Sequence, residues 1–85
     1  MKISVTQEDI RNGVPQDAAS CPIALACKRA KVCGDAEVFV RNTHIDCTDG
    51  RTFSLPYEAR RFINRFDSDP EFSDMTVQPF EFEVG

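Results

Sequence analysis

One segment of the chain, LPYEARRFINRF, has apolar residues at helical spacing and limits the folds open to the rest of the molecule. Pro56 suits the first position of a helix, where no N–H is needed, and Glu58 stands in the first turn. Such a helix must bury its stripe against another element, and a chain of 85 residues has one small core. We therefore expect a single domain over residues 1–85. The stripe consists of Leu55, Ala59, Phe62, Ile63 and Phe66.

The segment CPIALACKRA predicts a second helix, from about residue 22 to residue 31. Pro22 fits the first helical position, which leaves Cys21 as the N-cap. The basic residues Lys28, Arg29 and Lys31 suit the negative end of the helix dipole. Gly34 lies just past the expected end. The buried stripe is expected to consist of Ile23, Ala26, Cys27 and Ala30.

Several other segments alternate between apolar and polar residues and predict strands. The first, KISV, should bury Ile3 and Val5 and lead to a helical turn that Thr6 caps and Gly13 stops. AEVFV is strand-like. At the end of the chain, FEFEV should turn Phe80, Phe82 and Val84 inward, and Pro79 makes this strand an edge or starts it at about Phe80.

The segment THIDCTDGRTFSLP predicts a hairpin whose register follows from its apolar residues. A two-residue loop would mix polar and apolar residues on both faces. A three-residue loop, Thr48–Gly50 with Gly50 in the left-handed conformation, sets Ile45 opposite Phe53 and gives one apolar face. His44 and Asp46 should then point to the other face.

The expected order is strand, helical turn, helix, three strands, helix and strand. This order lacks the regular alternation of a parallel βαβ sheet and favours an α+β fold. We expect a small single domain with a mainly antiparallel sheet and two main helices packed on one face.

The four cysteines could form a metal site, a disulfide framework or a reactive thiol. Their spacing lacks the C-x2-4-C knuckle of structural zinc sites, and Cys21 and Cys27 should point about 240° apart on their helix. The chain shows no secretory h-region, so we expect a cytoplasmic protein with reduced, metal-free thiols. Cys27 and Cys47 then act as small core residues, whereas Cys33 is expected to be exposed.

Charge is distributed unevenly along the chain, whose net charge is −4. Residues 28–65 carry eight basic and five acidic residues, a net of +3, whereas residues 66–85 carry six acidic and no basic residues. The acidic set could be a solvated surface or a contact face for a partner with a basic surface. The candidate partner-binding residues are Asp67, Asp69, Glu71, Asp74, Glu81 and Glu83.

Other classes of function find little support in the sequence. It contains no P-loop, G-x-G-x-x-G, G-x-S-x-G or H-E-x-x-H motif, so we expect neither an enzyme nor a cofactor-binding protein. The acidic total disfavours direct nucleic-acid binding. No apolar run approaches the ~18 residues that a membrane span needs. The basic face with Arg60, Arg61 and Arg65 could meet phosphate or an acidic partner, although such faces are usually only solvated.

Three segments carry a resemblance to a protein family: VTQEDIRNGVPQDAASCPIALACKRA, LPYEARRFINRFD and PFEFEV. Together they resemble a family of small uncharacterised proteins of phages and prophages, with a V-T, D-I, G and C-P-I-A-x-A pattern and a terminal P-F-x-F. Where such families keep an aliphatic residue, this chain has Cys27. The resemblance implies a context in the bacterial host cytoplasm rather than a mechanism.

The sequence is therefore compatible with three functions. The first is a phage-type accessory protein that binds another protein, for instance a component of host defence. The second is a thiol- or zinc-dependent protein that uses Cys21, Cys33 and Cys47. The third is an assembly module that forms a homodimer through a strand edge.

Overall fold

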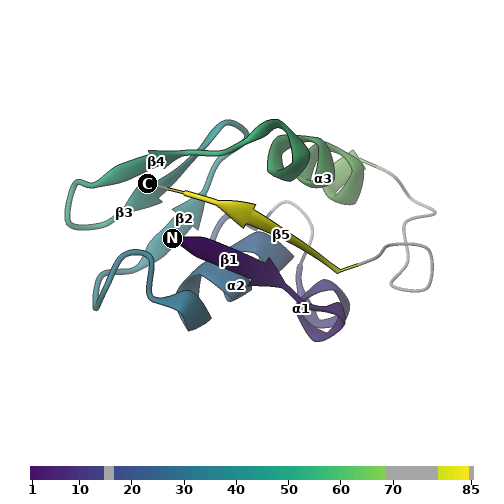
Figure 1. Cartoon of the computed structure of the whole chain (residues 1–85), viewed down its shortest axis with the longest axis horizontal. Helices are drawn as coiled ribbons and strands as arrows, with labels where there is room; N and C mark the ends of the chain where they lie inside the picture. Colours follow the sequence, from purple (N-terminus) through teal and green to yellow (C-terminus); the bar gives the residue numbers. More distant parts are fainter. Residues whose placement is uncertain (15–16, 69–78, 85) are drawn as a thin grey trace.

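The computed structural model describes residues 1–14, 17–68 and 79–84 and confirms the α+β class (Figure 1). The elements follow the expected order. They are β1 (Lys2–Val5), α1 (Gln7–Asn12), α2 (Pro22–Ala30), β2 (Val38–Val40), β3 (His44–Cys47), β4 (Thr52–Ser54), α3 (Tyr57–Ser68) and β5 (Phe80–Glu83).

The strands form two antiparallel sheets rather than one. β1 pairs with β5, so that Lys2 lies opposite Glu83 and Val5 opposite Phe80. The second sheet has the order β2-β3-β4. Helix α2 contacts both β1 and β2, and thereby connects the two sheets (Figure 1).

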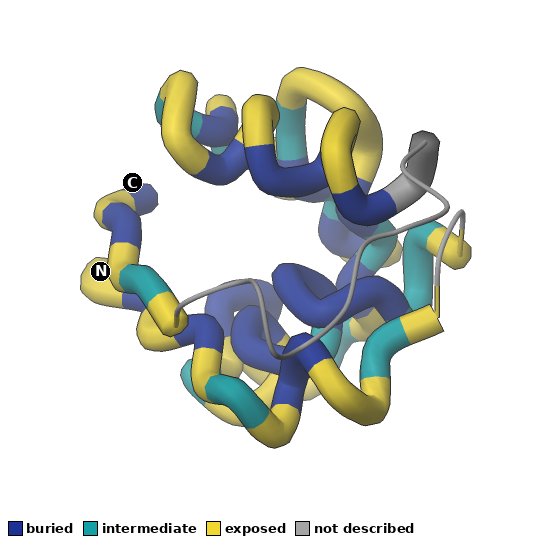
Figure 2. The backbone as a smooth tube through the Cα atoms, turned by 90° about the vertical axis from the view of Figure 1, so that its right-hand side faces the viewer, coloured by how far each residue is buried: buried dark blue, intermediate teal, exposed yellow. Residues whose placement is uncertain are grey.

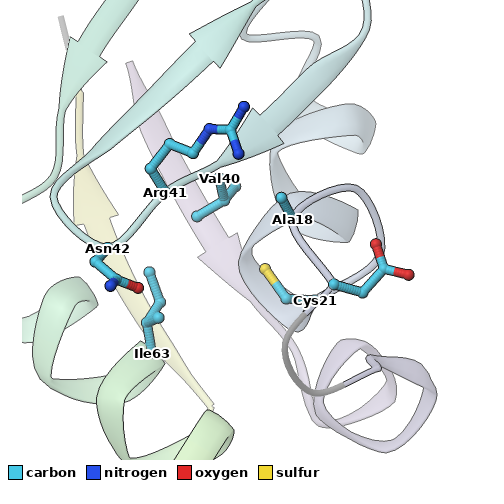
Figure 3. A pocket seen from close by; sticks show the side chains of 7 residues that line it. Ala18, Cys21, Val40, Arg41, Asn42 and Ile63 are labelled. Carbon is cyan, nitrogen blue, oxygen red and sulfur yellow. The ribbon is translucent and has the colours of Figure 1, made fainter.

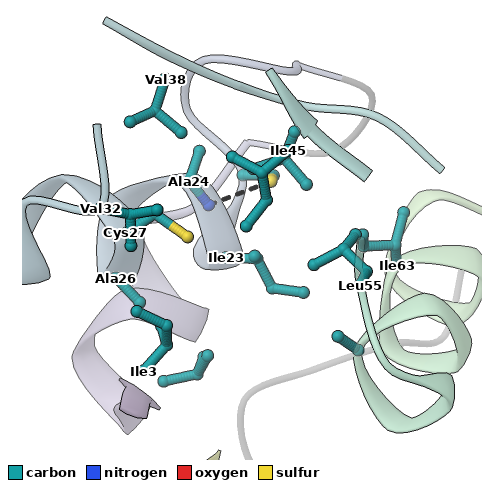
Figure 4. Close-up of a cluster of buried hydrophobic side chains, with 14 of the residues drawn as sticks. Ile3, Ile23, Ala24, Ala26, Cys27, Val32, Val38, Ile45, Leu55 and Ile63 are labelled. Carbon is teal, nitrogen blue, oxygen red and sulfur yellow. Dashed lines mark hydrogen bonds between the residues drawn. The ribbon is translucent and has the colours of Figure 1, made fainter. Parts of the chain in front are cut away.

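The core is built from the inward faces of both sheets and from α2 and α3. Ile3, Ile23 and Ile45, one from each of β1, α2 and β3, are completely buried. Ile23 extends toward Leu55 and Ile63 (Figure 4). Buried and exposed positions alternate along the chain (Figure 2). One continuous apolar cluster therefore joins two sheets whose described strands are not hydrogen-bonded to each other.

The hairpin has the predicted register. Ile45 lies opposite Phe53, and the Cys47 N–H donates to the Arg51 carbonyl at 2.9 Å, so three residues form the loop. Gly50 has a φ of 98°, in the left-handed region that favours glycine. The predicted faces are also confirmed, because Ile45 and Cys47 are buried whereas His44 and Asp46 are half-buried on the other side.

Helix α1 begins with a capping box, in which Thr6 and Asp9 satisfy each other's backbone N–H groups. The helix ends at Asn12, so Gly13 follows it as predicted. Its φ of −68° is nevertheless ordinary. A glycine is needed here for lack of space, because a Cβ would lie 2.7 Å from the Pro22 nitrogen and closer still to the Cγ and Cδ atoms of the same ring.

Helix α2 begins at the predicted residue. Cys21 is the N-cap, and its Sγ accepts a hydrogen bond from the Ala24 N–H at 3.4 Å. The helix ends at Ala30 because Lys31 adopts the left-handed conformation, with a φ of 58°. The Val32 N–H then donates to the Cys27 carbonyl, the closing bond of a Schellman turn.

Two predictions about the cysteines are wrong. Cys33 is buried, with 1% of its surface exposed, and it forms a disulfide with Cys47. The physical reason is the turn at Lys31, which folds the chain back toward β3. It brings the Cα atoms of the two cysteines to 5.5 Å, within the usual range for a disulfide. Arg51 secures this arrangement by donating to the Cys33 carbonyl at 2.8 Å.

Candidate functional site

The acidic residues of the predicted contact face are only partly described by the structure. Glu81 and Glu83 lie on the outward side of β5, and both are exposed, as predicted. Asp67 belongs to α3, but its side chain lies outside the described part of the structure, as do Asp69, Glu71 and Asp74. The structure therefore places two of the six candidates on one surface.

Both glutamates have a positively charged neighbour at the start of the chain, one on β1 and one just before it. The Lys2 ammonium lies 3.1 Å from Glu81, and the hydrogen bond between them raises the pKa of Lys2. The N-terminal ammonium lies 3.6 Å from Glu83. Because these groups are largely exposed, water competes with the pairs and they stabilise the fold little. The carboxylates therefore stay accessible to a partner.

A basic groove lies between the outer face of α3 and the turn that joins β2 to β3. Its volume is about 350 Å³. Asn42 and Thr43 of the turn form one side of this α3 groove, and α3 provides the other. The α3 side chains that line it are Tyr57, Arg60, Arg61, Asn64 and Arg65.

The lining of the α3 groove is basic. Its three arginines carry positive charge, its asparagines and hydroxyl groups can donate hydrogen bonds, and none of the described residues that line it is a carboxylate. Tyr57 has 67% of its surface exposed, one of the most exposed large side chains in the described structure. The sequence indicated the arginine face. It did not indicate Tyr57 as a surface residue of interest, although its position four residues before Arg61 was the available signal.

A second pocket, of about 380 Å³, adjoins the start of α2 (Figure 3). Cys21 and Ile63 line its floor, and Val40, Arg41 and Asn42 contribute from β2 and the turn after it. Cys21 is 7% exposed. None of the described residues that line this pocket is a histidine, so the structure shows no imidazole base beside a thiolate at Cys21.

The sulfur atoms of the other three cysteines are also poor candidates for thiolate chemistry. Cys33 and Cys47 bond to each other, so neither sulfur is a thiolate ligand. Burial raises the pKa of Cys27 to about 12, with a smaller contribution from Cys21, so its thiol stays protonated at neutral pH. Among the described residues, no group of three or more metal-ligating side chains comes together.

His44 and Asp46 form a polar cluster on the outer face of the three-stranded sheet. The His44 Nε2 lies 3.1 Å from one oxygen of Asp46, and the Arg41 Nε donates to the other oxygen at 3.2 Å. Thr43 Oγ1 lies 3.1 Å from His44 Nδ1. These contacts join residues that are close in sequence and partly exposed to solvent. Water competes with these pairs too, so they stabilise the strand face little.

The described residues form a small α+β domain in which exposed glutamates lie on β5 beside Lys2 and the N-terminal ammonium, and exposed arginines lie on α3. Comparisons with protein-family models, with curated proteins and with solved structures find no match. In the described part of the chain, no helix is both long and apolar enough to cross a bilayer.

Proposed function

We propose that the protein is a non-catalytic accessory protein that acts by binding another protein. The observation that supports this function is that exposed carboxylates and exposed guanidinium groups stand on different elements of the fold. Exposed carboxylates stand on β5, and exposed guanidinium groups stand on α3. Complementary charge raises association rates and rejects wrong partners, which suits a protein that acts by contact.

The acidic side of the molecule is proposed to meet a basic surface on the partner. Glu81 and Glu83 alternate along β5 and therefore point the same way. They continue the acidic character of residues 66–85, which carry no basic residue. The resemblance to phage proteins makes a host component, such as one of host defence, the class of partner to test first.

We also propose a cytoplasmic location. The state of the Cys33–Cys47 pair tests it, because the structure contains this disulfide. Disulfides are rare in a reducing cytoplasm, where Cys33 and Cys47 would be kept as thiols. Rapid alkylation of freshly lysed host cells, followed by mass spectrometry, reports the state of this pair. A fully oxidised pair in such cells would contradict a reducing location.

The binding proposal is tested by capture from host lysate with a variant that lacks the acidic face. Glu81→Gln and Glu83→Gln are combined with neutralisation of Asp67, Asp69, Glu71 and Asp74. Neutral side chains are preferable to lysines because Lys2 would otherwise face a second positive charge. We expect the variant to stay folded and to lose its partner.

The control neutralises three acidic residues elsewhere, at Glu8, Asp35 and Glu37, which are exposed. It is compared with a variant that neutralises three residues of the acidic face. Capture by the natural chain should also weaken as salt rises, because exposed charges are screened over ~8–10 Å at ordinary ionic strength. Equal capture by the acidic-face variant and the control would contradict the proposal. So would complex formation that salt does not affect.

A further inference from the structure

We infer that the α3 groove is a docking site for an acidic peptide segment of a partner protein. The inference takes its biological meaning from the proposed binding function, but it concerns a different face and a partner surface of the opposite sign. It rests on the arrangement of the groove, on the state of its charges and on its exposed aromatic ring.

Helical geometry brings the charged side chains of the groove onto one face. Tyr57, Arg61 and Arg65 follow each other at intervals of four residues, so they line up along the axis of α3. Asn42 and Thr43 face this row from the turn after β2. An extended segment lying between them would meet hydrogen-bond donors on both sides.

The arginines of the groove differ from others in the chain in their electrostatic surroundings. Arg60, Arg61 and Arg65 form no ion pair with any residue that the structure describes. Three other arginines do have carboxylate partners. Arg29 lies 2.7 Å from Asp9, Arg41 lies 3.2 Å from Asp46, and Arg51 lies 2.7 Å from Asp49. The fold therefore uses those three arginines internally and leaves the charge of the groove for a ligand.

The groove favours a peptide carboxylate over a nucleic acid. Affinity for nucleic acid comes from many phosphate contacts, and three guanidinium groups on a chain with a net charge of −4 supply few of them. A carboxylate matches the planar fork of one guanidinium in a bidentate pair. Tyr57 adds an exposed ring next to the charges, and tyrosine and arginine are enriched among residues that dominate protein interfaces.

The test is fluorescence anisotropy with a short labelled peptide of Glu, Asp, Ala and Leu. The comparison ligands are the same peptide with Gln and Asn in place of the acids, and single-stranded oligothymidine. We expect the acidic peptide to bind, the neutral peptide to bind at least about tenfold more weakly, and the affinity to fall as salt rises.

The variants locate the binding. Arg61→Gln should weaken the acidic peptide about tenfold, and Tyr57→Ala should also weaken it. The matched control is Lys31→Gln, which removes one positive charge from another exposed site and should change the affinity less than about twofold. Circular dichroism should show the same melting for all three variants, which confirms that the fold is intact.

Three results would overturn the inference. They are equal weakening by Arg61→Gln and Lys31→Gln, tighter binding of oligothymidine than of the acidic peptide, and a concentration-dependent dimer in sedimentation that Arg61→Gln abolishes. The last would mean that a second copy occupies the groove. The acidic-face variant changes no residue of the groove and should bind the acidic peptide as the natural chain does. Failure of the proposed function can therefore be told apart from failure of the groove inference.

Discussion

The ring of Phe62 on α3 lies 5.0 Å from the ring of Phe80 on β5, measured between centroids. Phe62 is also stacked on Phe66 at 5.8 Å, and Phe80 on Phe82 at 6.0 Å. This row of four rings attaches α3 to the sheet formed by β1 and β5. The apolar stripe of the helix and the terminal phenylalanines, each predicted to face the interior, therefore pack against each other.

The first prediction concerns this aromatic row. Phe62→Ala should lower the free energy of unfolding by about 3–5 kcal/mol, because it leaves a cavity between α3 and β5. Urea unfolding followed by circular dichroism measures the change. Tyr57→Ala on the exposed side of the same helix is the control, and it should stay within about 0.5 kcal/mol of the parent. Similar stabilities for the two variants would contradict the packing.

The second prediction concerns the disulfide. Replacing both Cys33 and Cys47 by Ser should cost about 3 kcal/mol, the amount expected for a closed loop of this length. Reductant should lower the melting temperature of the natural chain and leave that of the double variant unchanged. Intact mass should rise by two hydrogen atoms when the natural chain is reduced. An unchanged mass and melting temperature would mean that the pair is not bonded in solution.

The third prediction concerns the ion pair between Asp9 and Arg29, whose closest atoms lie 2.7 Å apart. Burial alone would raise the pKa of Asp9, but hydrogen bonds from Arg29 and Thr6 outweigh it, so the pKa is lowered. Because the pKa of Asp9 is lower in the folded state, the ion pair contributes its full stability at pH values above the unfolded pKa of about 3.9. This stability is lost as the pH falls through the folded value.

Asp9→Asn should therefore destabilise the protein near neutral pH by about 1.5–3 kcal/mol, toward the lower end because Arg29 is half-exposed. The difference from the natural chain should shrink in acid, below pH about 3.9. Asp35→Asn, at an exposed position, is the matched control and should have little effect. A difference that is constant from neutral pH into acid would exclude the pair as its source.

The fourth prediction concerns Gly13. Gly13→Ala should cost about 1–3 kcal/mol, because the added methyl group overlaps the Pro22 ring and forces α1 away from α2. Thermal unfolding measures the loss. Gly50→Ala is the contrasting control, since Gly50 has a φ of 98° and nothing lies within 4 Å of an added methyl group, so a loss of stability there comes from backbone conformation alone. A pairing of Gly13→Ala with Pro22→Ala should restore part of the stability.

Local features of this fold could be predicted from the sequence. The hairpin register followed from the alternation around Ile45 and Phe53, and the start of α2 followed from Pro22. The division into two sheets could not be predicted, because it depends on which edges the chain brings together over long separations. The disulfide was missed because the thiols were expected to be reduced in a cytoplasm. In addition, nothing in the sequence marks Lys31 as a left-handed residue, and that residue directs Cys33 inward.

The candidate sites were predicted to a smaller extent. The arginine face of α3 was visible as the side opposite the apolar stripe. The groove itself needs the turn at Asn42 and Thr43, which lies beside α3 only after the core has formed. For the acidic set, Glu81 and Glu83 are exposed as predicted, while the contact role of the set stays a prediction.

The pairing of β1 with β5 has a consequence for the order in which the molecule assembles. Residues 2 and 83 are partners, so this sheet closes a loop that spans nearly the whole domain. Such distant contacts cost chain entropy before they return any stability, and they slow folding. During synthesis, Ile3 and Val5 stay without their strand partners until Phe80 and Phe82 have been made. We therefore expect the hairpin and α2 to form early, and the domain to complete its fold only when its last strand arrives.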